Sequence, residues 1–360
     1  MPQRIAGLVV ATVVLGSLLA SLLSLAARHY WLADLAVHFR LQYAVVGGLA
    51  LLYYGWGRRG LPLMAAGLVV ALNAPAVFEQ LMPGAGMGAG AERSWPTAVA
   101  ATPAARASTA VVPAPSARVA DPRPLVVPAS RAASSAAPLR LAALNLFFAN
   151  QAHDQAIAWV RRARPEVAVF VEASPAWQLA LQALEVDYPH RLAIANGPRD
   201  GLLVLSRWPL RDPQLVPGRR DLLFVTVDKP GHPLRLAAVH ASWPLLPRHQ
   251  AQRAADFAAI AAEARAAARA GLPYAALGDY NISPFSPHFA QLLEAGGLRS
   301  ASAGRGWQPT WPTFLPPLGI QIDHALVTPD LQVTRFERGA GTGSDHRPIV
   351  VDLMMPAPAG

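Results

Sequence analysis

The sequence contains no cysteine and few charged residues. The absence of cysteine excludes disulfides, thiolate zinc sites and cysteine nucleophiles, and it leaves the redox compartment undetermined. Charged residues make up 15% of the 360 residues, which is low for a wholly soluble protein and suggests that some apolar residues face lipid. The chain is long enough for two ordinary domains, and no internal repeat is evident in it.

The net charge of +9 is spread along the chain. Residues 1–82 and 83–138 each carry five arginines against two acidic residues, and residues 139–360 carry 21 basic against 18 acidic residues, so each part has a net charge of +3. A dedicated DNA-binding domain normally gathers Lys and Arg on one face. The charge therefore gives no indication of such a domain, although it is compatible with a phosphate substrate.

Three apolar runs within residues 1–82 predict membrane helices. The first, Ile5–Ala26, has 22 residues without a charge, enough at 1.5 Å per residue to cross a hydrocarbon core of about 30 Å. The second, Leu41–Trp56, is shorter, and the third, Leu61–Leu81, contains Asn73 and Glu79. A cleavable signal peptide is the alternative for the first run, which exceeds the usual apolar region of ~7–15 residues. A transporter would need more helices and more intramembrane polar pairs.

The arginines at the ends of these runs predict an orientation. Arg4, Arg58 and Arg59 would lie on one side of the membrane, and Arg28 and Arg40 on the other. The positive-inside rule then favours a cytoplasmic N-terminus, and three crossings export the C-terminal domain. The margin is a single arginine.

The next segment, residues 83–138, is dominated by Pro, Ala, Ser and Gly. Such a composition buries too little apolar surface to offset the entropy of ordering, so we expect a disordered, flexible linker, with a small folded module as the alternative.

From residue 139 onward, short apolar runs alternate with helical segments. The runs predict strands, and the hairpin signal between two of them indicates sheets that are not purely parallel. The expected strands are Leu139–Leu144, Val167–Val171, Leu202–Leu205, Leu222–Val227, Leu234–Val239, Tyr274–Leu277, Ile322–Val327 and Ile349–Leu353. The expected helices have Asp154, Ser174 and Ser286 as N-caps, and a fourth covers roughly residues 248–270. We expect packed sheets flanked by helices.

Polar residues follow several of these strands. Taken singly, an Asp or Asn after a strand is more often a turn former, and a lone His is more often a structural residue. Together, carboxylates, amides and histidines are the groups used for metal-assisted phosphoryl chemistry. The candidates are Asn145, Glu172, His240, Asp279, Asn281, Asp323, Asp345 and His346, whereas we expect a structural role for His324.

The order of short motifs in residues 139–355 resembles the endonuclease/exonuclease/phosphatase superfamily. The motifs are Leu-Asn-Leu, Val-Phe-Val-Glu, Leu-Ser-Arg-Trp-Pro-Leu, Val-His-Ala-Ser-Trp-Pro, Gly-Asp-Tyr-Asn, Ile-Asp-His and Ser-Asp-His-Arg-Pro-Ile. The resemblance implies an α/β fold of the α+β type, a four-layer β-sandwich of two mixed sheets flanked by helices. It also implies a phosphodiesterase, nuclease or phosphatase that uses Mg²⁺, with Mn²⁺ as a second option.

The resemblance also implies roles for the candidate residues. Glu172 would be the principal metal ligand, with Asn145 and Asp345 close to the metal. Asp279 would orient or deprotonate the attacking water. The remaining roles concern the phosphate and the leaving group: Asn281 would hold the phosphate, His346 oriented by Asp323 would contact a phosphate oxygen or transfer a proton, and His240 would help to protonate the leaving group.

Two features depart from the family pattern. Several relatives carry a carboxylate two residues after the first-strand Asn, where this chain has Phe147, and Asn150 is an uncertain substitute. No long insertion of the kind that grips duplex DNA is evident. A lipid headgroup or other small phosphodiester is therefore slightly preferred over nucleic acid as the substrate.

The domain interpretation is a membrane anchor at 1–82, a linker at 83–138 and a catalytic domain at 139–360. By resemblance to membrane-anchored bacterial members, we expect a multi-pass protein of the bacterial inner membrane with its catalytic domain on the periplasmic or extracellular side. Its expected partners are the lipid bilayer and a phosphate-ester substrate, with no obligate protein partner evident. A catalytically inactive membrane protein that binds phosphorylated ligands is the alternative of another class.

Overall fold

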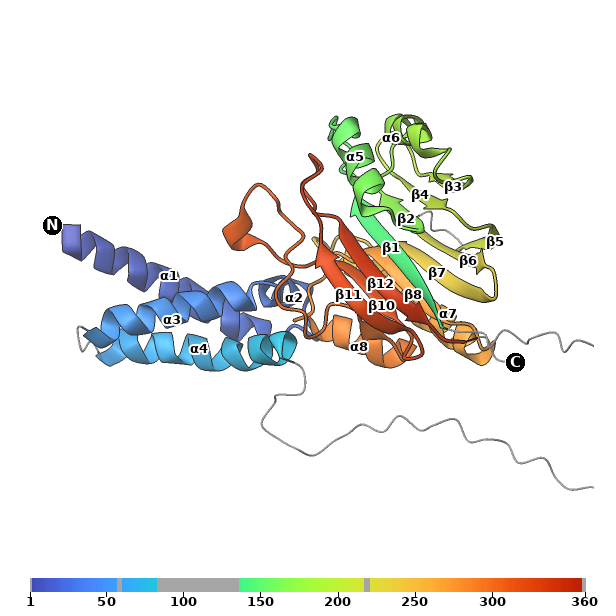
Figure 1. Cartoon of the computed structure of the whole chain (residues 1–360). Coiled ribbons are helices and arrows are strands. Elements are labelled where there is room, and N and C mark those ends of the chain that lie inside the picture. Colours follow the sequence, from blue (N-terminus) through green and yellow to red (C-terminus); the bar gives the residue numbers. More distant parts are fainter. Residues whose placement is uncertain (1, 57–59, 83–135, 217–220, 358–360) are drawn as a thin grey trace, which may run out of the picture.

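The computed structural model describes residues 2–56, 60–82, 136–216 and 221–357. Apolar helices lie at one end of the molecule, and two packed sheets with flanking helices lie at the other (Figure 1). The predicted linker, residues 83–138, lies outside the described residues up to residue 135.

The apolar N-terminal residues form helices α1 (Pro2–Ser24), α2 (Trp31–Val37), α3 (Arg40–Trp56) and α4 (Gly60–Leu81). Helices α1, α3 and α4 pack side by side (Figure 1). Helices α1 and α4 are long and apolar enough to cross a membrane. Helices α2 and α3 meet at a bend of 57° and pass the same test only as one broken span. The described residues thus hold two or three candidate spans, against three expected.

One polar contact joins the first and last of these helices. Asn73 of α4 is buried and donates to Ser21 Oγ of α1 at 2.7 Å and to the carbonyl oxygen of Val69 at 2.8 Å. A buried amide is tolerated because it is hydrogen-bonded, so Asn73 stabilises helix packing here.

Within the described residues, the C-terminal domain contains two six-stranded sheets. The first has the strand order β11-β12-β1-β2-β4-β3, and the second β5-β6-β7-β8-β10-β9. The strands are β1 (Ala137–Asn145), β2 (Val167–Val171), β3 (His190–Ala195), β4 (Gly201–Ser206), β5 (Leu210–Leu215), β6 (Leu222–Lys229), β7 (His232–His240), β8 (Tyr274–Asp279), β9 (Arg299–Ser300), β10 (Asp323–Val327), β11 (Gln332–Arg338) and β12 (Ile349–Met355). Both sheets mix parallel and antiparallel pairs, as expected.

The sheets pack face to face, and helices cover their outer faces, which makes four layers (Figure 1). A core that includes Leu141, Val169, Leu236 and Leu277 fills the space between the sheets. Helices α5 (His153–Ala163) and α6 (Pro175–Ala180), with the 3₁₀ turn η1 (Leu181–Leu184), cover the first sheet, and α7 (Pro247–Arg269) and α8 (Pro287–Gly296) cover the second. The predicted four-layer fold is confirmed.

The structure corrects one predicted helix start. Helix α5 has Ala152 as its N-cap and begins at His153, so the prediction of Asp154 as N-cap was wrong. Asn150 Oδ1 accepts from the backbone N–H of Ala152 at 2.9 Å, and this Asx turn starts the helix early. The predicted caps Ser174 and Ser286 both accept a backbone N–H of their helix.

Candidate active site

The predicted site residues meet at one edge of the two packed sheets. Strands β1 and β2 run parallel with Asn145 opposite Val171, so Glu172 follows directly beside Asn145. Strands β7 and β8 also run parallel, and their register places His240 opposite Asp279. Because parallel strands end at the same edge, side chains distant in sequence come together there.

Strand β10 adds a further carboxylate from the opposite direction. It is antiparallel to β8, and Asp323 at its start is paired with Asp279. The glycine of Gly-Asp-Tyr-Asn permits the approach of β7 to β8: Gly278 has a φ of +142°, and a Cβ there would lie 1.9 Å from Val239 O. No side chain fits at position 278, so glycine is required directly before Asp279.

Asn145 connects the two halves of the site. Its amide nitrogen donates to Glu172 Oε1 at 3.0 Å and to Asp279 Oδ2 at 3.1 Å, while its Oδ1 accepts from the backbone N–H of Phe147 at 2.9 Å. The other oxygen of Glu172 accepts from the backbone N–H of Phe148 at 3.1 Å. The Asn145 amide therefore positions two carboxylates, one from each sheet.

Three buried side chains contact one another in the order Asp323, His346, Asp279. His346 Nδ1 lies 2.9 Å from Asp323 Oδ2, and Nε2 lies 3.8 Å from Asp279 Oδ2. Burial lowers the pKa of His346, but the charges of Asp323 and Asp279 outweigh it, so the pKa lies above its ordinary value. Burial raises the pKa of Asp279, and the cationic His346 opposes that shift. The charged imidazole of His346 thus lies beside the Asp279 carboxylate, whose pKa is raised.

His240 has a carboxylate partner that the sequence reasoning missed. Its Nδ1 lies 3.5 Å from Asp200 Oδ1, an ion-pair distance beyond good hydrogen-bond geometry, and its Nε2 lies 4.0 Å from Glu172 Oε1. Burial lowers the pKa of His240, but Asp200, Asp279 and Glu172 together raise it to about 9. A signal for Asp200 existed: it immediately precedes β4, which runs antiparallel to β2 and therefore starts at the edge where Glu172 lies.

Asn281 lies at the same edge in a left-handed conformation. Its φ is +50°, its backbone N–H donates to Asp279 Oδ1 at 2.8 Å, and its side-chain amide donates to Ala241 O at 2.9 Å. Phe147 and Glu172 also have positive φ, 57° and 51°. Left-handed backbone is unusual for side chains other than glycine and is often found at functional sites, where the surrounding structure stabilises it.

Two carboxylates fit the divalent cation that the resemblance implies. Oδ1 of Asp345 is buried and has no hydrogen-bond partner among the described residues, while Oδ2 accepts from Trp311 Nε1 at 3.2 Å. Burial raises the pKa of Asp345; the charge of His346 opposes this shift, and the negative charge of Glu172 adds to it. A cation bound between two carboxylates stabilises the charged form of both. Asp345 and Glu172 therefore match a hard metal ion.

Asp279, Asp323 and His346 form a second possible cation site, because one ligand atom of each lies within 4.8 Å of the others. We favour Glu172 with Asp345 for two reasons. His346 is already paired with Asp323 and carries a proton, and Mg²⁺ prefers oxygen to imidazole ligands.

Two residues that the sequence analysis considered, Asn150 and His324, lie outside this cluster. The Asn150 amide donates to the carbonyl oxygens of Leu146 and Thr342, each at 3.2 Å, so it stabilises a turn and does not replace the carboxylate missing at Phe147. His324 is fully buried, and its Nε2 lies 2.8 Å from Ile282 O.

A cavity of about 490 Å³ opens onto the site. Its lining combines the polar candidates with apolar side chains, among them Phe148, Trp243 and Ile320. Leu35 and His38, from the N-terminal helices, also line it. The cavity thus belongs to both parts of the chain.

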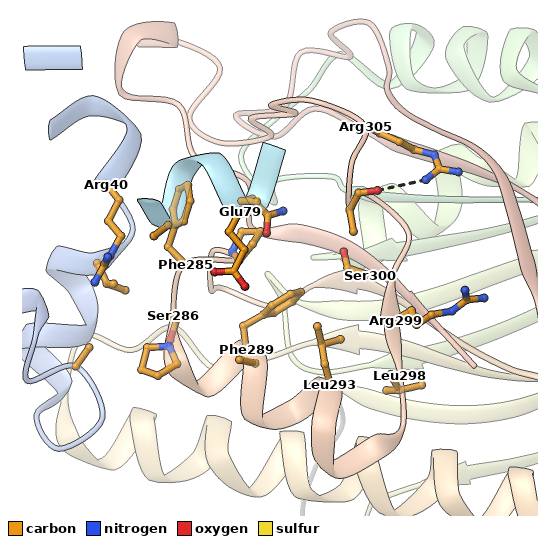
Figure 2. Close-up of a pocket in the computed structure, with 18 of the residues that line it drawn as sticks. Arg40, Glu79, Phe285, Ser286, Phe289, Leu293, Leu298, Arg299, Ser300 and Arg305 are labelled. Atoms are coloured by element: carbon orange, nitrogen blue, oxygen red, sulfur yellow. Dashed lines mark hydrogen bonds between the residues drawn. The ribbon is translucent and has the colours of Figure 1, made fainter. Parts of the chain in front are cut away.

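A larger cavity of about 1020 Å³ lies at the junction of the N-terminal helices and the C-terminal domain (Figure 2). The arginines that line it do not gather around one point where an anion could bind, since Arg40 and Arg299 lie on opposite sides of the cavity (Figure 2). Arg305 donates to the carbonyl oxygen of Val333 at 2.6 Å. None of the predicted site residues lines this cavity, so the chemistry is assigned to the smaller one.

Comparison with known proteins agrees with this geometry. Residues 142–346, more than half of the chain, match the model of the endonuclease/exonuclease/phosphatase family. No curated protein matches the chain.

Several solved structures share the fold. An endonuclease/exonuclease/phosphatase from Beutenbergia cavernae has a TM-score of 0.50 and 21% identity over 62% of this chain and 73% of its own. TDP2 from C. elegans has a TM-score of 0.50 and 16% identity over 60% of this chain and 75% of its own. D. rerio TDP2, solved with a single-strand DNA product, has a TM-score of 0.50 and 15% identity over 60% of this chain and 99% of its own. With the family match over residues 142–346, the chain belongs to the endonuclease/exonuclease/phosphatase family.

Proposed function

We propose that this protein is a membrane-anchored phosphodiesterase that uses a divalent metal ion, Mg²⁺ or alternatively Mn²⁺. The observation that supports the proposal most directly is the convergence of Glu172, Asp279 and His346 at one sheet edge. Asn145 joins Glu172 to Asp279, and His346 Nε2 lies 3.8 Å from Asp279 Oδ2. Such a cluster is costly for stability, because it takes several ionisable groups out of water at one edge of the fold, and groups of this kind are typical of active sites.

Glu172 and Asp345 would hold the metal ion, with Asn145 positioning Glu172. A bound Mg²⁺ neutralises negative charge that develops on a phosphate oxygen during hydrolysis. Magnesium keeps several of its waters, so few protein carboxylates suffice, and the absence of a carboxylate at Phe147 is compatible with binding.

Asp279 is the proposed base for the attacking water. The backbone N–H of Asn281 and the Asn145 amide hold its carboxylate in place, and burial raises its pKa toward that of a useful proton acceptor. In the reaction one P–O bond forms to the water oxygen and one ester P–O bond breaks. The water proton passes to Asp279, and Asn281 contributes to binding the phosphate.

The two histidines are proposed to act on the phosphate and on the leaving group: His346 would hydrogen-bond a phosphate oxygen, and His240 would be the proton donor. Asp323 orients His346 toward the phosphate, and Asp200 holds His240 near Glu172. Both imidazoles carry a proton at neutral pH because neighbouring carboxylates raise their pKa values. His240 would donate its proton to the leaving ester oxygen, and such transfer typically contributes about 10²–10⁴-fold to the rate.

The anchor is also part of the proposal. Helices α1, α3 and α4 would cross the inner membrane, and the arginine distribution would place the catalytic domain on the periplasmic or extracellular side.

The full-length protein in detergent, assayed against bis-p-nitrophenyl phosphate with Mg²⁺, tests the proposal. Turnover should disappear with a chelator and fall by at least about 10³-fold in Asp279→Asn and His346→Asn, since each removes a group acting in the reaction. Arg269→Met, an exposed substitution on α7, is the matched control and should keep full activity. Binding of phosphate esters without any hydrolysis by the parent protein would instead support the inactive, ligand-binding alternative.

A nuclease is the second candidate within the same chemistry. Phe148 and Trp243 are exposed at the cavity, and the Arg199 guanidinium lies 5.3 Å from the centre of the Phe148 ring, an arrangement on which a base could stack. Cleavage of a single-stranded oligonucleotide in preference to small diesters would favour this candidate.

A further inference from the structure

The N-terminal helices contribute directly to the wall of the active-site cavity. Leu35 of α2 and His38, at the break between α2 and α3, line the same cavity as Glu172 and Asp279. His38 Nδ1 lies 2.9 Å from Ser283 Oγ and accepts from the backbone N–H of Ser283 at 3.3 Å. The anchor therefore forms part of the site, in addition to retaining the domain.

A buried ion pair maintains this arrangement. Asp34 of α2 pairs with Arg253 of α7, and the two side chains are 0% and 1% exposed. The Asp34 carboxylate also accepts from Ser286 Oγ, and Arg253 donates to Asn281 O at 3.0 Å. A buried charge is stable only when it is paired, so the pair favours one defined position of α2 beside the site.

Exposed apolar side chains lie on two loops of the catalytic domain that contribute residues to the cavity, Trp243 from the first loop and Trp311 and Ile320 from the second. On the first, Trp243 is 55% exposed and Leu245 is 42% exposed. On the second, Phe314 is 75% exposed and Leu315 is 43% exposed. We call these four residues the apolar rim. Large exposed apolar side chains on loops beside a cavity often mark a contact surface.

The second loop of the apolar rim lies against the anchor. Gln42 of α3 donates to the carbonyl oxygen of Gly319 at 2.9 Å, just beyond the 3₁₀ turn η2 (Pro316–Leu318). Figure 1 shows this loop, in orange, extending from the sheets toward the anchor helices. The second loop is thus attached to a helix of the anchor, which would place Phe314 and Leu315 near the depth of the lipid headgroups.

We propose that the site hydrolyses a phosphate ester of a membrane lipid, whose headgroup enters the cavity while its acyl chains stay in the bilayer against the apolar rim. This inference rests on the proposed phosphodiesterase function and specifies its substrate. A cavity of about 490 Å³ is of the size that holds one small-molecule group, which suits a headgroup and excludes long chains.

The charge of the cavity favours a lipid over nucleic acid. Among its described lining residues, Arg199 is the one Lys or Arg, against the four acids Glu172, Asp200, Asp279 and Asp345. These described lining residues do not offer the row of Lys and Arg side chains with which a nucleic-acid site neutralises successive phosphates. A single phosphate diester needs only the metal ion as counter-charge.

The test uses the full chain reconstituted into vesicles of phosphatidylcholine and phosphatidylglycerol, with Mg²⁺. Release of water-soluble headgroup products is measured beside hydrolysis of bis-p-nitrophenyl phosphate and of a single-stranded oligonucleotide. We expect headgroup release to exceed oligonucleotide cleavage. Hydrolysis of bis-p-nitrophenyl phosphate without headgroup release, or preferential oligonucleotide cleavage, would overturn the lipid inference and leave the phosphodiesterase proposal intact. Hydrolysis of none of the three would overturn both.

Variants of the rim separate membrane contact from chemistry. The double substitution Phe314→Ser with Leu315→Ser should lower headgroup release by about tenfold, because lost apolar area weakens contact with the bilayer, and leave bis-p-nitrophenyl phosphate hydrolysis unchanged. Val186→Ser is the matched control: Val186 is 97% exposed but lies in the turn after η1, outside the rim. An equal effect of the rim and control substitutions on headgroup release would contradict the proposal.

Discussion

Replacing Arg253 with methionine tests whether the anchor and the catalytic domain act as one unit. The Asp34 and Arg253 side chains are 0% and 1% exposed, and their contact joins α2 to α7 across more than two hundred residues of sequence. Methionine keeps most of the volume of the arginine stem but leaves the Asp34 carboxylate buried with Ser286 as its remaining hydrogen-bond donor.

The expected loss follows from the burial of the pair. Removing one partner of a fully buried ion pair costs about 3–5 kcal/mol, because the other charge stays desolvated. For a unit of this size each kcal/mol corresponds to about 2–4 °C in melting temperature, so Arg253→Met should lower it by roughly 6–20 °C. The double variant Asp34→Asn with Arg253→Met removes both charges and should recover part of that loss.

The assay is thermal unfolding of the full-length protein in detergent, with and without Mg²⁺. Arg269→Met on the same helix is the control: Arg269 is exposed in the last turn of α7, and its loss should cost less than about 1 kcal/mol. A melting temperature for Arg253→Met no lower than that of Arg269→Met would refute the reasoning. The same result would show that α2 is not held against the catalytic domain.

Three further outcomes are expected. Asp323→Asn should lower kcat by about 10²–10⁴-fold with little change in KM, because His346 loses the carboxylate that orients it; an unchanged kcat would remove Asp323 from the mechanism. Mg²⁺ should raise the melting temperature of the parent protein but not of Glu172→Gln, measured by the same unfolding assay; equal stabilisation of both would exclude Glu172 as a ligand. Gly278→Ala should destabilise the fold by at least about 3 kcal/mol, since its Cβ would lie 1.9 Å from Val239 O, and near-native unfolding would contradict that clash.

The sequence alone predicted the central strands and the main site residues. The eight expected strands all occur, because each is a short apolar run buried on both faces and bounded by turn residues. Glu172, Asp279 and His346 could be identified because each lies at the end of such a strand or within three residues of it, within a motif of adjacent residues. These are local properties, and local patterns are visible in a sequence.

The strands that the sequence did not reveal lie mostly at sheet edges. Strands β3, β5, β9 and β11 were not predicted. They are the four edge strands of the two sheets, and their side chains are partly exposed to water. Exposed positions accept polar residues, so the alternation of apolar side chains that identifies a strand is lost there.

Tertiary structure decided the remaining features of the site. Asp200 beside His240, the Asp34–Arg253 pair, and Leu35 in the cavity all depend on contacts between distant segments. The pairing of a buried charge is determined by which elements pack together, and no spacing in the sequence encodes it. The sequence therefore determined which groups are available for phosphate-ester chemistry, whereas packing decided that the anchor helps to enclose them, because only packing removes these charges from water.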